Sequence, residues 1–166
     1  MPLKILASIF LVASFPVMAQ PNAGADDLTF EGQLLLTLHS VNTMEIAAGQ
    51  LAVARGNSAA VRQFGAQLVK DHRAAEEQVL ALALQRNVKI PVDVADDGLV
   101  ALSARTGDAF DNAFILMMLD GHIKTIATVK GAQARINNVA MKAFLQTLVP
   151  TLESHRDTAA ALSKGN

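Results

Sequence analysis

Apolar residues recur at spacings of three and four along four long segments of the chain, which is the pattern of amphipathic helices. The predicted helices cover residues 28–55, 58–86, 106–135 and 137–163, each to within a few residues. Between the first two helices, Gly56 is a C-cap signal and Asn57-Ser58 offers the next N-cap, so the connection is very short. No segment shows the strict alternation of a β-strand. The pattern therefore predicts an all-α, antiparallel four-helix bundle in one domain.

The connection between the second and third predicted helices is longer than the other two. Residues 87–98 break the helical pattern with Pro, Asp and Gly, and a short helical piece around 99–103 is expected within this crossover. At the start of the third helix, Asp108 as N-cap with Asp111 three residues on resembles a capping box in which Asp replaces Glu. Pro150 inside the fourth helix predicts a kink there.

Each helix carries one apolar stripe, and an ionisable residue interrupts each stripe once. The stripes, followed by steps of three and four, are Leu35, Leu38, Val41, Glu45, Ala48 and Ala52; Val61, Gly65, Leu68, His72, Ala75, Val79 and Leu82; Ile115, Met118, His122, Ile126 and Val129; and Met141, Leu145, Leu148, Leu152, His155, Ala159 and Leu162. The four interruptions lie near the middles of their helices. Because mid-helix residues of an antiparallel bundle meet at one level, we expect Glu45, His72, His122 and His155 to converge.

Buried carboxylates and imidazoles need partners, since burying them alone costs several kcal/mol. Three imidazoles and one carboxylate suit a single divalent transition-metal ion, Zn²⁺, Fe²⁺, Mn²⁺ or Cu²⁺. The alternative is a metal-free hydrogen-bonded network that only fixes the register of the bundle. The residues leave these two interpretations open.

Other polar residues in the helices carry weaker signals. Asp71 and Asp120 adjoin His72 and His122 in sequence, and they are candidates to orient imidazoles behind a metal, although helix geometry favours a solvated face. His39 is expected to be an ordinary, partly exposed histidine, and Glu76 a solvated helix charge. The methionines are expected to be core filler, the usual role of Met at helical spacing.

The N-terminus has the features of a secretory signal peptide. Lys4 provides a positive charge, residues 5–15 are apolar, and Val17-Met18-Ala19 has the small or β-branched residues of a cleavage site. We expect residues 1–19 to be removed, 20–27 to form a flexible leader, and 28–164 to form the bundle. The apolar stretch is shorter than the roughly 20 residues of a membrane span. The mature protein is therefore predicted to be periplasmic, without a transmembrane segment.

Composition excludes several classes of function. The chain has no cysteine, so disulfides, thiolate metal sites and cysteine nucleophiles are excluded. Without Lys4, the chain has 13 basic and 15 acidic residues, which gives a net charge of −2, and it has no basic cluster. This composition argues against a nucleic-acid partner. No nucleophile turn, phosphate-binding loop or dinucleotide motif is present. No enzymatic reaction is indicated, and the partner, a protein or a small ligand, stays unidentified.

Nearly the whole predicted mature chain resembles domain-of-unknown-function family 4142, a family of exported bacterial proteins. The resemblance is carried by residues 43–52, by 61–65 leading to Asp71-His72, by 110–122 and by 148–155. It implies a ferritin-like bundle and a cell-envelope location, with outer-membrane association left open, and it implies no established activity.

The chain departs from the di-iron pattern of ferritin-like proteins, which needs Glu-x-x-His on two helices and a Glu on each of the others. The residues three before His72, His122 and His155 are apolar: Val69, Leu119 and Leu152. A mononuclear site is therefore the stronger metal hypothesis. The functional hypotheses are a periplasmic metal-binding or stress-related protein, a structural or interaction module of the envelope, and, third, a metal-dependent oxidoreductase.

Overall fold

The computed structural model describes residues 29–91 and 97–165, and the predicted signal peptide and leader lie outside these ranges. The elements are α1 (Phe30–Arg55), α2 (Ala59–Gln85), α3 (Asp97–Ser103), α4 (Gly107–Gln133) and α5 (Val139–Gly165). The four long helices confirm the predicted all-α bundle, and α3 is the short helix expected in the crossover. None of the described helices is both long and apolar enough to span a membrane.

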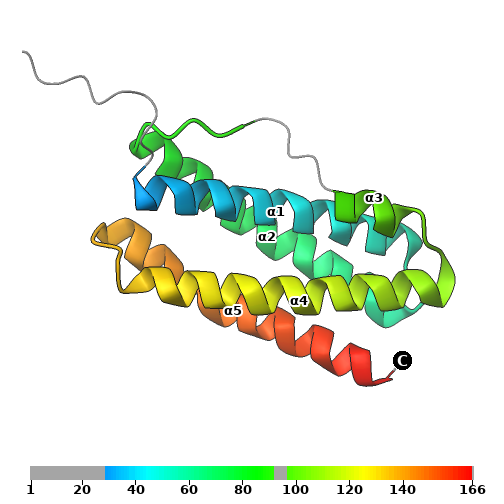
Figure 1. Cartoon of the computed structure of the whole chain (residues 1–166). Coiled ribbons are helices and arrows are strands. Elements are labelled where there is room, and N and C mark those ends of the chain that lie inside the picture. The colour runs from blue at the N-terminus through cyan, green and yellow to red at the C-terminus, as the bar shows by residue number, and fades with distance from the viewer. Residues whose placement is uncertain (1–28, 92–96, 166) are drawn as a thin grey trace, which may run out of the picture.

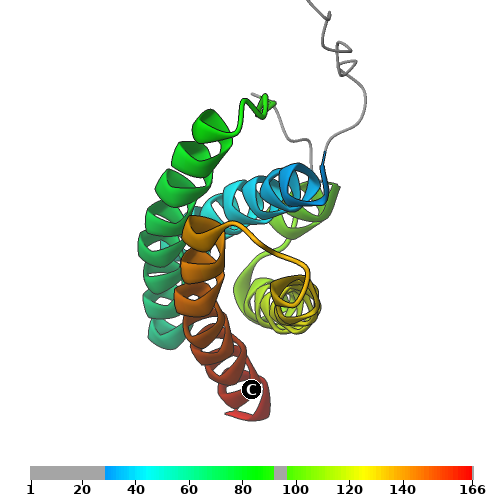
Figure 2. The ribbon, with the colours of Figure 1, turned by 90° about the vertical axis from the view of Figure 1, so that its left-hand side faces the viewer.

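The bundle consists of two antiparallel hairpins, α1 with α2 and α4 with α5 (Figure 1). The hairpins meet along two seams, one between α2 and α5 and the other between α1 and α4 (Figure 2). The short α3 packs at one end, against α1 and α4. Every neighbouring pair of long helices is antiparallel, so the middles of all four lie at a similar level.

The helices begin where capping side chains satisfy free backbone N–H groups. Thr29 accepts a hydrogen bond from the N–H of Gly32, Ser58 from that of Val61, and the side chain of Asn138 from that of Met141. Because such capping residues can be recognised in the sequence, the predicted starts of the second and fourth helices lie close to the observed ones.

The predicted capping box at the start of α4 is wrong. The N-cap position belongs to Thr106, whose side chain makes no capping hydrogen bond, and Gly107 takes a positive φ of 57°. The carboxylate of Asp111 instead accepts hydrogen bonds from the backbone N–H groups of Asn57 and Ser58, both at 2.8 Å. It therefore holds the turn between α1 and α2 against α4.

The α1–α2 hairpin is closed by direct backbone contact. A Cβ atom placed on Gly65 would lie 2.7 Å from both the carbonyl oxygen of Gly49 and the Cβ of Ala52. Only glycine allows this approach, since such a distance is far inside van der Waals contact. The contact fixes the register of α1 against α2.

Two apolar clusters fill the bundle, one at each end. The first joins residues such as Leu35, Val79 and Leu145, and the second joins residues such as Phe64, Phe110 and Phe114. All predicted stripe residues are buried except two. Val41 is half-buried because Asn42 faces the interior in its place, and Leu162 is half-buried near the end of α5. Between the clusters lies a layer of buried polar side chains.

Candidate metal centre

The four residues that interrupt the apolar stripes come together in the polar layer. Glu45 and His122 are 0% exposed, and His72 and His155 are 2% exposed. One carboxylate oxygen, Oε2 of Glu45, lies 3.0 Å from Nε2 of His72 and 3.3 Å from Nε2 of His122. The predicted convergence is therefore present, one side chain from each long helix.

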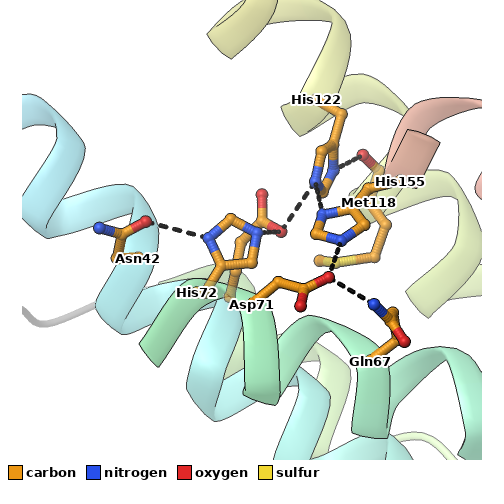
Figure 3. Close-up of polar contacts among 8 residues, drawn as sticks. Asn42, Gln67, Asp71, His72, Met118, His122 and His155 are labelled. Atoms are coloured by element: carbon orange, nitrogen blue, oxygen red, sulfur yellow. Dashed lines mark hydrogen bonds and ion pairs between the residues drawn. The ribbon is translucent and has the colours of Figure 1, made fainter. Parts of the chain in front are cut away.

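The three imidazoles face one another (Figure 3). One nitrogen from each ring of His72, His122 and His155 belongs to a set whose members all lie within 4.8 Å of one another. Nε2 of His122 and Nδ1 of His155 are 3.2 Å apart. We call these three nitrogens, Nε2 of His72, Nε2 of His122 and Nδ1 of His155, together with the Glu45 carboxylate, the inner donor set.

The opposite nitrogen of each ring, which we call the outer nitrogen, is hydrogen-bonded to an oxygen outside this set. Nδ1 of His122 lies 2.8 Å from the backbone carbonyl of Met118, which can only accept. Nε2 of His155 lies 2.9 Å from Oδ2 of Asp71. Nδ1 of His72 lies 3.0 Å from Oδ1 of Asn42.

The orientation of the Asn42 amide is determined by Glu76. The amide nitrogen of Asn42 donates to Oε2 of Glu76 at 3.0 Å, and a carboxylate only accepts, so Oδ1 of Asn42 must be the atom that faces His72. Oε1 of Glu76 in turn lies 2.6 Å from Nδ1 of His39, whose Nε2 is 3.1 Å from the carbonyl oxygen of Pro91.

Two sequence-based expectations are wrong at this point. His39 is 7% exposed rather than partly exposed, and Glu76 is a hydrogen-bonded, mostly buried group rather than a solvated charge. Asn42 was not among the residues predicted from the sequence. Its position three residues before Glu45, and that of Glu76 four residues after His72, were the available signals, since such spacings share a helix face.

The outer hydrogen bonds fix the tautomers of the three rings. A neutral imidazole has one N–H, and each outer nitrogen uses it to donate to an oxygen. In the neutral rings the inner nitrogens therefore carry lone pairs. His122 and His155 thus present two acceptors to each other at 3.2 Å, with no proton between them when both rings are neutral.

The Glu45 carboxylate has no compensating donor either. Neither of its oxygens has a hydrogen-bond partner among the described residues, and neither does Nε2 of His72. The 3.0 Å between His72 and Glu45 is an ion-pair distance, but the two atoms are not aligned for a hydrogen bond. When the three rings are neutral, the inner donor set is therefore a buried group of acceptors with no donor among them.

Burial makes protonation a costly way to supply such a donor. It lowers the pKa of His122 below the ordinary 6.5, an effect that the nearby Glu45 opposes without cancelling. Burial also lowers the pKa of His155, against the opposing hydrogen bond to Asp71. Both rings are therefore neutral at pH 7, as metal binding requires.

Of the two aspartates considered as orienting groups, the structure brings only Asp71 to the site. Burial acts to raise the pKa of Asp71, but hydrogen bonds from His155 and Gln67 together lower it, so its carboxylate is ionised at neutral pH. It contacts His155 of α5 rather than its sequence neighbour His72. Asp120 is exposed and pairs with Lys124.

Comparison with known proteins identifies a family and a similar fold. The family model described as "Domain of unknown function (DUF4142)" matches residues 16–162. No curated protein matches the chain. Among solved structures, the chain is similar to "CopM in the Cu(I)-bound form", with a TM-score of 0.72 and 11% identity, over 83% of this chain and 98% of that one. At this identity the similarity shows the helical fold alone.

Proposed function

This chain belongs to the family Domain of unknown function (DUF4142), and we propose that it binds one divalent transition-metal ion in the centre of its bundle. The ligands would be Glu45, His72, His122 and His155. The observation that carries the proposal is the tautomer pattern. Three outer nitrogens donate to oxygens, which leaves four acceptors around one small, buried volume.

The charges near the site favour a divalent ion over a monovalent one. The Glu45 carboxylate is in the inner donor set, and the Asp71 carboxylate lies behind His155. A dication balances these two negative charges, whereas buried charge without balance is costly. The Asp71–His155 pair also matches the carboxylate–histidine–metal arrangement that orients many metal ligands.

Four nitrogen and oxygen donors fit Zn²⁺ and Cu²⁺ best among the common ions. Imidazole suits Zn, Cu, Fe and Ni, and affinity rises along the first-row series to Cu²⁺. Cu⁺ favours sulfur ligands, which the inner donor set lacks. The solved structure of similar fold is nevertheless a Cu(I)-bound protein, so Cu⁺ belongs among the ions to test.

The role that fits this site is binding rather than catalysis. All four protein ligands are 0–2% exposed, and a closed set of four protein ligands is typical of non-catalytic metal sites, whereas catalytic sites keep a position open for water. With the export predicted from the N-terminus, the protein would hold metal in the periplasm. The mass of the secreted protein, expected to start at Gln20, checks the export.

The second candidate is a purely structural bundle whose polar layer is a hydrogen-bonded network. It is favoured by the 3.2 Å separation of His122 and His155, a distance that one added proton would turn into a hydrogen bond. In that case one ring is an imidazolium, and the site needs no metal.

Titration of metal into metal-free protein separates the two candidates. A metal that binds only the folded state raises the melting temperature progressively with its free concentration. We expect one equivalent of Zn²⁺ or Cu²⁺ to bind, in protein without a His tag, and His72→Ala, His122→Ala and His155→Ala each to abolish stoichiometric binding.

His39→Ala is the control for loss of an imidazole outside the inner donor set. Because His39 bonds to Glu76, which orients Asn42, the control is judged by the stoichiometry of binding and not by the affinity. It should still bind one equivalent. If none of Zn²⁺, Cu²⁺, Fe²⁺, Mn²⁺ or Cu⁺ shifts the melting temperature, or if a shift survives in the triple His→Ala variant, the proposed site is wrong and the structural role takes its place.

A further inference from the structure

A cleft of about 500 Å³ opens on the surface between α2 and α5 and ends at one of the proposed ligands. Its rim includes exposed, uncharged polar residues, among them Gln63, Gln67 and Thr158. Its floor is formed by the buried rings of Phe64 and His155. One face of the His155 ring is therefore close to the cleft, while its Nδ1 belongs to the inner donor set.

A partly exposed carboxylate lies on the same seam. Asp71 lines a second cleft of about 220 Å³ between α2 and α5, and its side chain is 21% exposed. The same carboxylate accepts hydrogen bonds from His155 at 2.9 Å and from Gln67, a rim residue of the first cleft, at 2.5 Å. Asp71 thus links the solvent to the buried ring, and it holds that ring in place.

Neither the backbone contact between α1 and α2 nor the cleft on the α1–α4 seam gives such access to the inner donor set. Glu45, His72 and His122 line neither of the two clefts between α2 and α5. The α1–α2 interface is shut by the backbone contact of Gly49 with Gly65. A cleft on the α1–α4 seam, next to Thr128, is lined by none of the four proposed ligands.

We propose that the metal ion enters and leaves through the α2–α5 seam, and that Asp71 and His155 form the gate. This inference rests on the proposed metal-binding function. The ionised Asp71 attracts the incoming cation, and the glutamine, serine and threonine side chains of the rim supply oxygens that replace its water. Rotation of the His155 side chain away from Asp71 then opens the path to the inner donor set.

Filling the cleft tests the route without changing a ligand. Thr158→Trp places a large ring at the exposed rim, and Thr128→Trp places the same ring on the α1–α4 seam as the matched control. The two threonines are alike, since each is exposed and bonds to the carbonyl four residues before it. Metal-free protein would be mixed rapidly with Zn²⁺ or Cu²⁺, whichever the titration shows to bind, and the loaded protein with excess chelator.

In Thr158→Trp we expect both uptake and release to slow by about tenfold, a change within the range of association rates among variants of one binding site. Because both rates change by the same factor, the equilibrium affinity should stay the same. Thr128→Trp should match the unmodified protein. Unchanged rates in Thr158→Trp, or slowing only in Thr128→Trp, would overturn the proposed route even if one equivalent of metal binds.

The gate itself is tested at Asp71. Asp71→Asn keeps an oxygen for His155 but removes the charge, so uptake should slow by about tenfold, and the affinity should fall by about 10- to 100-fold as for other groups behind a ligand. Asp120→Asn is the control, because Asp120 is an exposed carboxylate close to His122 in sequence. If Asp71→Asn changes release alone and leaves uptake unaltered, Asp71 only orients His155 and the gate is refuted.

Discussion

At the scale of single residues, the hydrogen-bond partner of one ring nitrogen decides whether the other nitrogen of a neutral, buried histidine carries a lone pair or a proton. The convergence of four side chains could be predicted from the sequence, because each of them breaks an apolar stripe: Glu45, His72, His122 and His155. The tautomers could not be predicted, since these depend on acceptors in the folded chain, including the backbone carbonyl of Met118. For His72 the acceptor is an amide oxygen whose direction is set by a third residue, Glu76, and no sequence spacing reveals that.

Replacing Asn42 tests the tautomer argument. Asn42→Leu keeps the volume and removes the acceptor for Nδ1 of His72, so that ring is free to turn or to move its proton to the inner nitrogen. Metal affinity should fall by about 10- to 100-fold, the usual effect of losing an orienting partner behind a metal ligand. Competition with a chelator of known affinity measures the change.

Asn57→Leu is a control of the same residue type at the end of the hairpin, where the Asn57 side chain bonds to Asp108 rather than to the site. Its metal affinity should equal that of the unmodified protein. An Asn42→Leu protein that is folded and binds metal with undiminished affinity would show that His72 needs no fixed tautomer.

At the scale of helices, local sequence signals were sufficient to predict that each helix exists. They were less useful for predicting which side chains bond to one another. The starts of α2 and α5 follow from Ser58 and Asn138, which cap through their own helix. Asp111 was misassigned because its carboxylate caps a turn more than 50 residues away in sequence. The close α1–α2 approach was also invisible beforehand, since Gly65 was simply one small residue of a stripe.

That approach leads to a prediction for the stability of the hairpin. In Gly65→Ala the new methyl group would meet the carbonyl of Gly49 and the side chain of Ala52 at 2.7 Å, so α1 and α2 must move apart. We expect the free energy of unfolding to fall by about 1 to 3 kcal/mol, as overpacked interiors show. Denaturant unfolding followed by circular dichroism measures it.

The comparison is Gly131→Ala in α4, where the added methyl group meets nothing within 4 Å. There the higher helix propensity of alanine should stabilise the protein by up to about 1 kcal/mol. The two variants should therefore differ in sign, and equal effects at both positions would contradict the packing argument.

At the scale of the whole molecule, a polar layer separates two apolar clusters, and its protonation should govern how stability depends on pH. The sequence predicted the level of this layer, because antiparallel helices bring their middles together. It did not predict the direction of the pKa shifts, which come mainly from burial in the folded bundle. Measuring that direction would separate a metal-binding site from a hydrogen-bonded network that needs no metal.

In metal-free protein, the lowered pKa values of His122 and His155 mean that the unfolded chain binds more protons than the folded one just below pH 6.5. Stability therefore rises with pH in that window, is fully present above about 6.5, and is lost as pH falls through the folded-state values. The pKa of Asp71 is lowered too, so its contribution to stability has the same sign. That contribution is lost only below the ordinary Asp pKa of 3.8, so the pH window of Asp71 is separate from that of the two histidines.

In a network built on an imidazolium paired with Glu45, the pKa of that imidazolium would instead be raised, and the stability that it contributes would be lost as pH increases. Urea unfolding between pH 5 and 8, with the His122→Gln protein subtracted to isolate one ring, measures the slope. A negative slope would favour the network, whereas a positive slope leaves the inner donor set neutral and ready for a cation other than a proton.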